Sequence, residues 1–129
     1  MHVVGSRVLL RPSDYERSVA FYEGDLGLVR YREWGTPGHR GVVFFLGGGY
    51  LELGEGAGTE PPAGVRLWLQ VADVVAVHAE LIQRGVRIQA PPERMPWGLI
   101  EMTLADPDGL QLVVVETPAD HPLRRDTRS

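Results

Sequence analysis

The chain contains one pattern of elements twice. Residues about 6–55 and about 65–116 each predict a strand, a helix and three further strands. Asp14 and Asp73, which precede the two predicted helices, are 59 residues apart, and Gly27 and Gly85, which follow them, are 58 apart. An internal period of this kind indicates a duplicated supersecondary unit. We therefore expect two βαβββ modules, joined by a linker over 54–64 that is rich in Gly, Pro and Glu.

The length of the chain limits it to one ordinary domain. It has 129 residues, of which 43% are hydrophobic, enough for one core and too few for two. We assign residues 1–117 to a single domain and residues 118–129 to a flexible tail. The arginines of that tail are Arg124, Arg125 and Arg128, and Asp126 interrupts them. They are typical of a solvated terminus.

The first helix is predicted after the strand 8–10. Ser13 is the expected N-cap, because Glu16 follows it at the spacing of a capping box. Gly24 or Gly27 is the expected end of the helix. The apolar positions of one helix face are Tyr15, Val19, Tyr22 and Leu26, and the adjoining Phe21 is also expected in the core.

The remaining elements follow from turn residues and hydrophobic periodicity. The first module should continue with strands over 28–34, 41–46 and 50–53. The second should have strands over 65–71, 86–88, 99–104 and 110–115, with a helix over 74–84 capped by Asp73 and ended by Gly85. In the last strand, Gln111, Val113 and Val115 should share one face.

Composition argues against nucleic acid and membrane as partners and indicates a compartment. The net charge is −4 and no basic face is apparent, so nucleic acid is not an expected partner. No run approaches the roughly 20 apolar residues of a membrane span, so no membrane partner is expected either. Cysteine is absent, which fits a reducing compartment. We expect a soluble, cytoplasmic protein.

Several motifs resemble those of one known superfamily. They are Ser13-Asp14-Tyr15-Glu16-Arg17-Ser18-Val19-Ala20-Phe21-Tyr22, Leu26-Gly27-Leu28, Trp97-Gly98 and Asp106-Pro107-Asp108-Gly109. From about Ser6 to Glu116 the chain resembles the vicinal-oxygen-chelate superfamily, which includes glyoxalase I, extradiol dioxygenases, fosfomycin-resistance transferases and bleomycin-resistance proteins. The resemblance implies an α+β fold in which two βαβββ modules form a cupped mixed sheet, with helices outside and a pocket inside. It also implies that the Gln111 face of the last strand lines the pocket.

The metal ligands of that superfamily are mostly missing. The positions that match them hold Val8, Glu52, Arg66 and Val113, of which only Glu52 can coordinate a metal ion. A one-residue shift of the match brings in Arg7, Leu9, Leu67, Leu112 and Val114, none of them a metal ligand. The histidines, His2, His39, His78 and His121, lack partner spacing. We therefore expect no metal and no other cofactor.

The role of Glu52 stays open between two interpretations. It could form a partly buried ion pair with Arg66, since the resemblance places both residues in the cup. It could instead act as a general acid or base, although no second titrating group is placed to work with it.

Large aromatic side chains are the expected replacement for the metal site. Trp68 alternates with Arg66 and Gln70 on one strand, Trp34 ends a strand, and Trp97 lies in a loop that the superfamily often places at the pocket rim. Such rings can stack on flat ligands, although each could also be a core or dimer-interface residue. The predicted ligand-binding residues are Val8, Leu10, Trp34, Tyr50, Glu52, Arg66, Trp68, Gln70, Trp97, Gln111 and Val113.

Three functions remain as hypotheses. The first, suggested by resemblance to bleomycin-resistance proteins, is a homodimer that sequesters a bulky aromatic natural product or antibiotic in a groove between subunits, without chemistry. The second is an isomerase, lyase or dioxygenase of the same fold that uses Glu52. The third is a regulatory or accessory module with a vestigial cleft.

Overall fold

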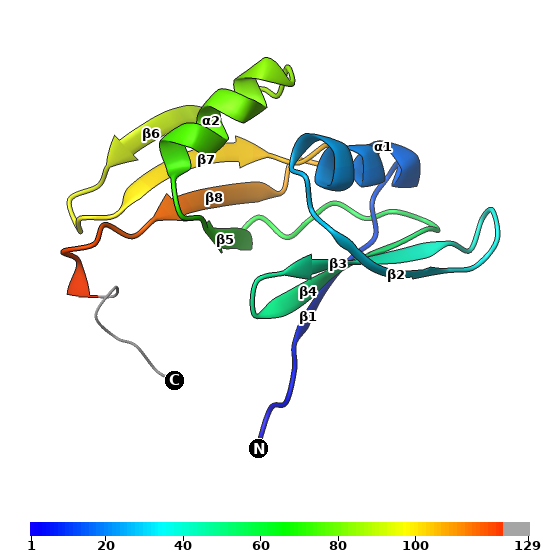
Figure 1. The fold of residues 1–129 in the computed structure, drawn as a ribbon. Helices are drawn as coiled ribbons and strands as arrows, with labels where there is room; N and C mark the ends of the chain where they lie inside the picture. The colour runs from blue at the N-terminus through cyan, green and yellow to red at the C-terminus, as the bar shows by residue number, and fades with distance from the viewer. Residues whose placement is uncertain (123–129) are drawn as a thin grey trace. The chain divides into compact units, whose positions relative to one another are not determined.

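The computed structural model describes residues 1–122 and divides the chain into two compact units (Figure 1). Unit 1 is Met1–Ala63 with Pro107–Gly109, and unit 2 is Gly64–Asp106 with the residues from Leu110 on. Arg124, Arg125, Asp126 and Arg128 of the predicted tail lie outside the described residues. Within residues 1–122, no helix is long and apolar enough to cross a membrane.

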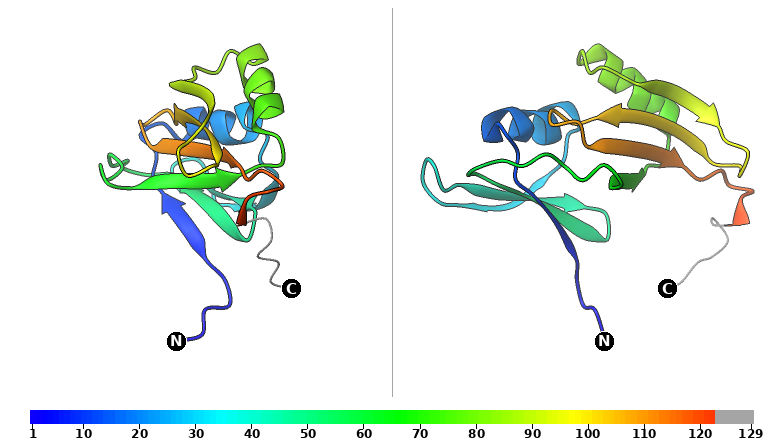
Figure 2. Two further views of the ribbon diagram at one scale, coloured as in Figure 1. Left: turned by 90° about the vertical axis from the view of Figure 1, so that its left-hand side faces the viewer. Right: turned by 180° about the vertical axis from the view of Figure 1, so that it is seen from behind.

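Unit 1 is the first predicted βαβββ module. Its strands form a mixed sheet, sheet A, in the order β1-β4-β3-β2, with β1 parallel to β4 and the other pairs antiparallel. The elements are β1 (Arg7–Leu10), α1 (Tyr15–Val19), the π-helical turn η1 (Ala20–Asp25), β2 (Arg30–Trp34), β3 (Gly41–Leu46) and β4 (Gly49–Gly54). The two further views show the helix covering one side of this sheet (Figure 2).

The first helix begins one residue later than predicted. The N-cap is Asp14, whose carboxylate accepts a hydrogen bond from the amide of Arg17 at 3.1 Å. Ser13 instead donates its hydroxyl and amide hydrogens to the carboxylate of Asp108. The capping-box prediction was therefore wrong, because the Ser13 side chain binds Asp108, which is distant in the sequence, instead of capping the helix. The helix ends before Gly27, which has a φ of +73°.

Unit 2 repeats the topology of unit 1. Its sheet, sheet B, has the order β5-β8-β7-β6, with β5 parallel to β8 and the other pairs antiparallel. The elements are β5 (Arg66–Gln70), α2 (Val74–Gln83), β6 (Ala90–Arg94), β7 (Ile100–Ala105) and β8 (Gln111–Glu116). The α+β class and the two βαβββ modules are thus confirmed, and Asp73 caps α2 as predicted.

One predicted strand was wrong. The segment 86–88 is not a strand, because the amide of Val86 donates to the carbonyl of Leu81 and that of Gly85 to Ile82, which closes α2 in a Schellman motif. The strand that pairs with β7 is β6, which contains Pro91 and Pro92. Proline cannot donate to a ladder, but β6 lies at the sheet edge, where this loss is tolerated.

Each core lies between a sheet and the helix of the same unit. In unit 1 the guanidinium of Arg30 binds Glu23 of η1, so the Arg30 side of sheet A faces the helix. By strand register that side carries fully buried residues, namely Val42, Phe44, Leu51 and Leu53. The core of unit 2 includes Leu112, Leu104 and Met102, with Val74 and Leu81 from α2. Phe21 and Tyr22 are buried as predicted.

Candidate functional site

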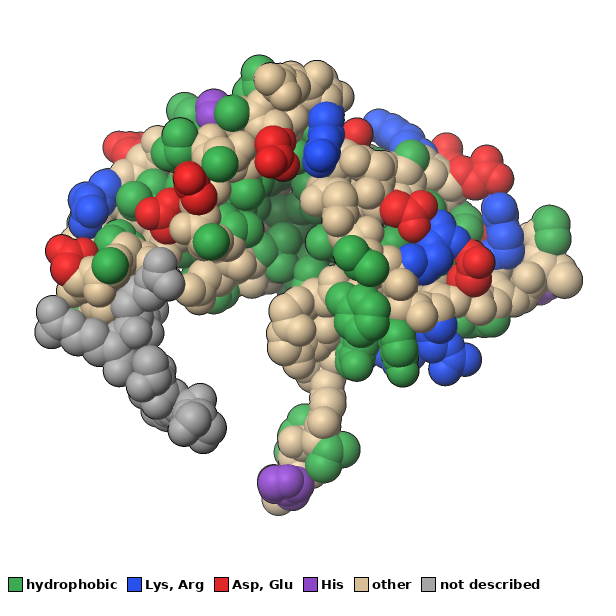
Figure 3. All heavy atoms as spheres, viewed as in Figure 1, with side chains coloured by type: hydrophobic (Ala, Val, Ile, Leu, Met, Phe, Trp, Pro, Cys, Tyr) green, Lys and Arg blue, Asp and Glu red, His purple; other side chains and the backbone are tan. Residues whose placement is uncertain are grey.

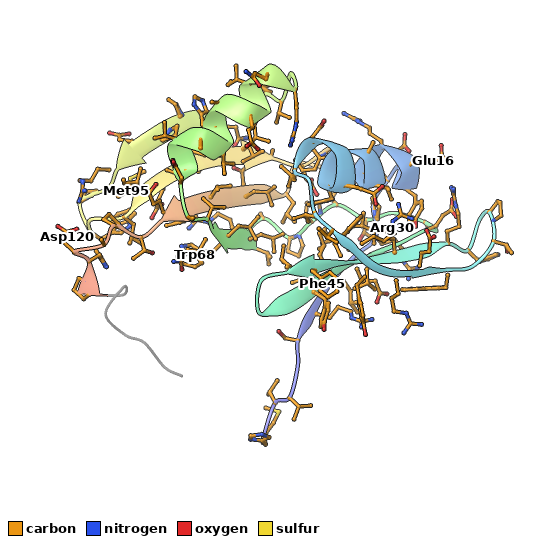
Figure 4. The ribbon with its side chains drawn as sticks, viewed as in Figure 1. Glu16, Arg30, Phe45, Trp68, Met95 and Asp120 are labelled. Atoms are coloured by element: carbon orange, nitrogen blue, oxygen red, sulfur yellow. The ribbon has the colours of Figure 1, made fainter. Side chains whose placement is uncertain are left out.

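Each sheet has a second side, which faces away from the helix of its own unit. In Figure 4, Phe45 and Trp68 lie on these sides of sheets A and B. Face A, defined by strand register and ring contacts, consists of Arg7, Leu9, Tyr31, Arg32, Trp34, Gly41, Val43, Phe45, Tyr50, Glu52 and Gly54. Face B consists of Arg66, Trp68, Gln70, Ala90, Glu93, Glu101, Thr103, Ala105, Gln111, Val113 and Val115. These faces are the candidate binding surfaces.

Three aromatic rings form a cluster on face A. The Tyr31 ring lies 5.0 Å from that of Phe45 and stacks on Tyr50 at 5.1 Å, and the rings of Phe45 and Tyr50 are 5.8 Å apart. Tyr31 is 49% exposed and Phe45 is 45% exposed. The space-filling view shows hydrophobic side chains beside arginines on this part of unit 1 (Figure 3). Rings that pack on one another while half exposed provide a preformed surface for a flat ligand.

A β-bulge assembles this cluster. In β2, Arg30 pairs with Phe44 and Arg32 pairs with Val43, so Tyr31 is an extra residue in the ladder. Because of the bulge, both Tyr31 and Arg32 project from face A, whereas strict alternation would put them on opposite sides. Sequence reasoning missed both residues, and no local signal in the sequence marks the bulge.

Glu52 has a charged partner within unit 1. Its carboxylate lies 2.8 Å from the guanidinium of Arg7, which also lies 5.8 Å from the centre of the Tyr50 ring. Register places Arg7, Tyr50 and Glu52 on the same face. The hypothesis of an Arg66 partner overlooked Arg7, which lies on the strand next to Glu52. A general base at this position would have to release this ion pair.

Trp34 lies flat on a glycine of the neighbouring strand. A Cβ atom added to Gly41 would come within 2.3 Å of the indole. The guanidinium of Arg32 lies 5.4 Å from the indole centre on the same face. Trp34 is 39% exposed, so one ring face packs on backbone while the side chain keeps access to solvent.

Two predicted ligand-binding residues lie on the helix side of sheet A, opposite to Glu52. Val8 pairs with Leu51 and Leu10 pairs with Leu53, and both partners belong to the helix side. The structure therefore does not bring Val8 and Leu10 together with Glu52. The β1 residues that project from face A are Arg7 and Leu9, and Leu9, which is 67% exposed, is the residue that pairs with Glu52.

Face B has the predicted alternation along β5. Arg66, Trp68 and Gln70 are all exposed, and the intervening Leu67 is buried. Register aligns this row with Gln111, Val113 and Val115 of β8. Val113 is only 5% exposed and packs with Leu99 and Val115, so it serves mainly as core.

Trp97 lies in the turn between β6 and β7, at one end of face B. Its indole Nε1 donates to the carboxylate of Glu101 at 2.7 Å, which fixes the ring orientation while the side chain stays 58% exposed. The Nε2 atom of His121 lies 2.9 Å from the carbonyl oxygen of Trp97. The last described residues thus hold this turn in place.

Candidate metal-binding side chains do not gather in one place among the described residues. Within residues 1–122, no three His, Cys, Asp or Glu side chains cluster in a way that could hold a metal ion. His2 and His39 are exposed, and His78 is half-buried in α2.

A polar pocket of unit 1 was not predicted. It has a volume of about 340 Å³ and is lined by Ser13, Asp14, Tyr15, Glu16, Arg40, Glu55 and Gly56. The carboxylate of Glu55 accepts two hydrogen bonds from the Arg40 guanidinium, at 2.9 and 2.8 Å, which lowers the pKa of Glu55 to about 2. Burial raises the pKa of Tyr15, whose ring lies under the Arg40 guanidinium. The charge of Arg40 is neutralised by Glu55 and Glu16, so the charged side chains that line this pocket form ion pairs with one another.

Comparison with known proteins agrees with this architecture. A solved structure of a member of the glyoxalase/bleomycin resistance protein/dioxygenase superfamily from Sphaerobacter thermophilus DSM 20745 is 28% identical, with a TM-score of 0.71 over 89% of this chain and 98% of its own. The crystal structure of SMU.1112c is 29% identical, with a TM-score of 0.75 over 90% and 99%.

A lactoylglutathione lyase from Agrobacterium tumefaciens, 19% identical, shares the fold with a TM-score of 0.67 over 85% of this chain and 90% of its own. No curated protein matches the chain. The model of the Glyoxalase/Bleomycin resistance protein/Dioxygenase superfamily matches residues 2–114. The chain therefore belongs to the glyoxalase/bleomycin resistance protein/dioxygenase superfamily.

Proposed function

We propose that this protein binds a bulky aromatic natural product or antibiotic and sequesters it unchanged. The observation that carries the proposal is the cluster of Tyr31, Phe45 and Tyr50, whose rings are preassembled on face A while two of them stay about half exposed. Large exposed apolar side chains that gather in one place are typical of binding surfaces. Stacking on such rings contributes about 1 kcal/mol per pair beyond the area buried.

Two of the positions that match metal ligands of the superfamily favour binding over chemistry. Glu52 of the first module is engaged by Arg7, and Val113 of the second module is a buried aliphatic residue. Face B offers the exposed rings of Trp68 and Trp97. We also propose that a second copy of the chain completes the binding groove, as in the bleomycin-resistance proteins that the sequence resembles.

Titration of the chelator-treated protein with a panel of aromatic antibiotics tests the proposal. Saturable quenching of tryptophan fluorescence, with the ligand recovered at unchanged mass and unchanged chromatographic retention, is the expected result. The variant with both Tyr31→Ser and Phe45→Ser should lose most of the affinity. Val75→Ser, which removes an exposed apolar side chain from α2, is the matched control and should bind as the wild type does.

The same titration discriminates the enzymatic alternative. Ligand recovered with a changed mass, or as a separable isomer, would show turnover, and Glu52→Gln should then abolish it while binding persists. Sedimentation analysis with and without ligand tests the second copy. If the protein is a monomer and still binds the ligand with unchanged affinity, the proposed sequestration stands but the proposed groove between subunits is contradicted. The absence of saturable binding across the panel would contradict sequestration.

A further inference from the structure

Face A has one positive charge without a negative partner. Its charged residues are Arg7, Arg32 and Glu52, and the first and last neutralise each other at 2.8 Å. Arg32 is exposed and, among the described residues, has no carboxylate within ion-pair distance; its guanidinium lies over the indole of Trp34. The whole chain carries a net charge of −4, so the excess positive charge of this face runs against the overall balance.

The bulge in β2 puts this charge next to the aromatic cluster. Arg32 follows Tyr31 directly, and both project from the same side of the sheet. A guanidinium beside a stack of rings matches a ligand that carries an anionic group at the edge of an aromatic system, because Arg pairs with carboxylates in a fixed planar geometry. Face B differs, since Arg66 shares it with the carboxylate of Glu101.

We infer that the ligand of face A is a planar aromatic molecule with an anionic group such as a carboxylate. Tyr31, Phe45 and Tyr50 receive the ring system, and Arg32 receives the anion. This inference rests on the proposed function, because it names the chemical class of the molecule that the same face binds.

A pair of isosteric probes tests the charge separately from the ring. The two probes are 2-naphthoate and 2-naphthamide, titrated into the full-length ¹⁵N-labelled protein and followed by the amide signals of face A and the indole signal of Trp34. We expect the carboxylate to bind at least about fivefold more tightly than the amide. Added salt should weaken the binding of the carboxylate probe but not that of the amide probe.

Two variants change the charge of face A in opposite directions. Arg32→Met should weaken the binding of 2-naphthoate about tenfold and should change the affinity for 2-naphthamide by no more than about twofold. Glu52→Gln frees Arg7 from its partner and should tighten 2-naphthoate binding without affecting the amide. Arg17→Met, which removes an exposed arginine from α1, is the control and should leave both affinities unchanged.

The possible outcomes distinguish a failure of this inference from a failure of the proposed sequestration function. Equal binding of the two probes, insensitive to Arg32→Met and Glu52→Gln, would overturn the anionic class while leaving aromatic sequestration in place. Failure of both probes to perturb face A would overturn the inference too, and the antibiotic panel would then decide the proposed function by itself. Tighter binding of the amide than of the carboxylate would also contradict it.

Discussion

Trp34 and Gly41 face each other across the β2–β3 ladder, and the indole occupies the space that any side chain at position 41 would need. A Cβ at this glycine would come within 2.3 Å of two ring atoms of Trp34. The orientation of the indole on face A therefore depends on a residue without a side chain.

Gly41→Ala should displace this indole. The ring is partly exposed and can swing toward solvent, so we expect a red-shifted Trp34 emission and a change in unfolding free energy below about 1 kcal/mol. Fluorescence in a background with Trp68→Phe and Trp97→Phe isolates the signal, since the chain has three tryptophans. Gly54→Ala, at the β4 position that pairs with Gly41, meets nothing within 4 Å and should leave the spectrum unchanged. An unshifted spectrum in Gly41→Ala would argue against the packing.

Acid should remove the stabilisation that comes from Glu55. Its pKa in the folded protein is about 2, against an ordinary value of 4.5, because the Arg40 guanidinium donates hydrogen bonds to the carboxylate. A lowered pKa stabilises the folded state above about pH 4.5, and this contribution disappears as the pH falls toward 2. The difference in denaturant midpoint between wild type and Glu55→Gln should therefore be largest above pH 4.5 and shrink toward pH 2.

Glu60→Gln provides the control for this titration. It removes an exposed carboxylate that makes no ion pair with the described residues. A difference between wild type and Glu55→Gln that stays constant from pH 6 to pH 2 would be inconsistent with the Arg40–Glu55 geometry.

Leucines on the two sides of sheet A should differ in their contribution to stability. Leu51 is fully buried on the helix side, so Leu51→Ala should cost about 2–5 kcal/mol of unfolding free energy. Leu9, on the neighbouring strand, projects from face A, and Leu9→Ala should change stability by no more than about 0.5 kcal/mol. Urea denaturation measures both. Similar costs for the two substitutions would mean that the assigned register of β1 is wrong.

The cap of α2 should depend on the side-chain acceptor of Asp73. The carboxylate accepts a hydrogen bond from the amide of Ala76 at 3.0 Å, and Asp73→Ala should destabilise the protein by about 1 kcal/mol. Asp73→Asn keeps an acceptor of the same geometry and should cost much less. If Asn and Ala destabilise equally in thermal unfolding, the cap hydrogen bond does not stabilise the helix.

Local sequence signals were sufficient for most elements but not for the edge strand β6. The boundaries of β3 and the N-cap of α2 were predicted correctly because glycine turns and a capping Asp act within a few residues. The strand β6 was missed because its prolines argue against a strand, and only its edge position makes them acceptable.

The residues of the candidate binding face were also predicted only in part from local sequence signals. Trp34, Tyr50 and Glu52 were predicted as ligand-binding residues and share face A, whereas Val8 and Leu10 project from the other side. A shift of one residue along a strand reverses the side to which every side chain points. Register with a neighbouring strand decides this, and it involves residues more than 40 positions away, as in the pairing of Leu9 with Glu52.

The sequence by itself determined the duplicated βαβββ pattern and the superfamily. These depend on periodicity, turn residues and side-chain chemistry, which are properties of single segments. Only the tertiary structure decided that Tyr31 and Arg32 project from one face, that Arg7 neutralises Glu52, and that Gly41 makes room for Trp34. Each of these arises from the pairing of separate strands, whose register and bulges are set by how the whole sheet packs against its helix.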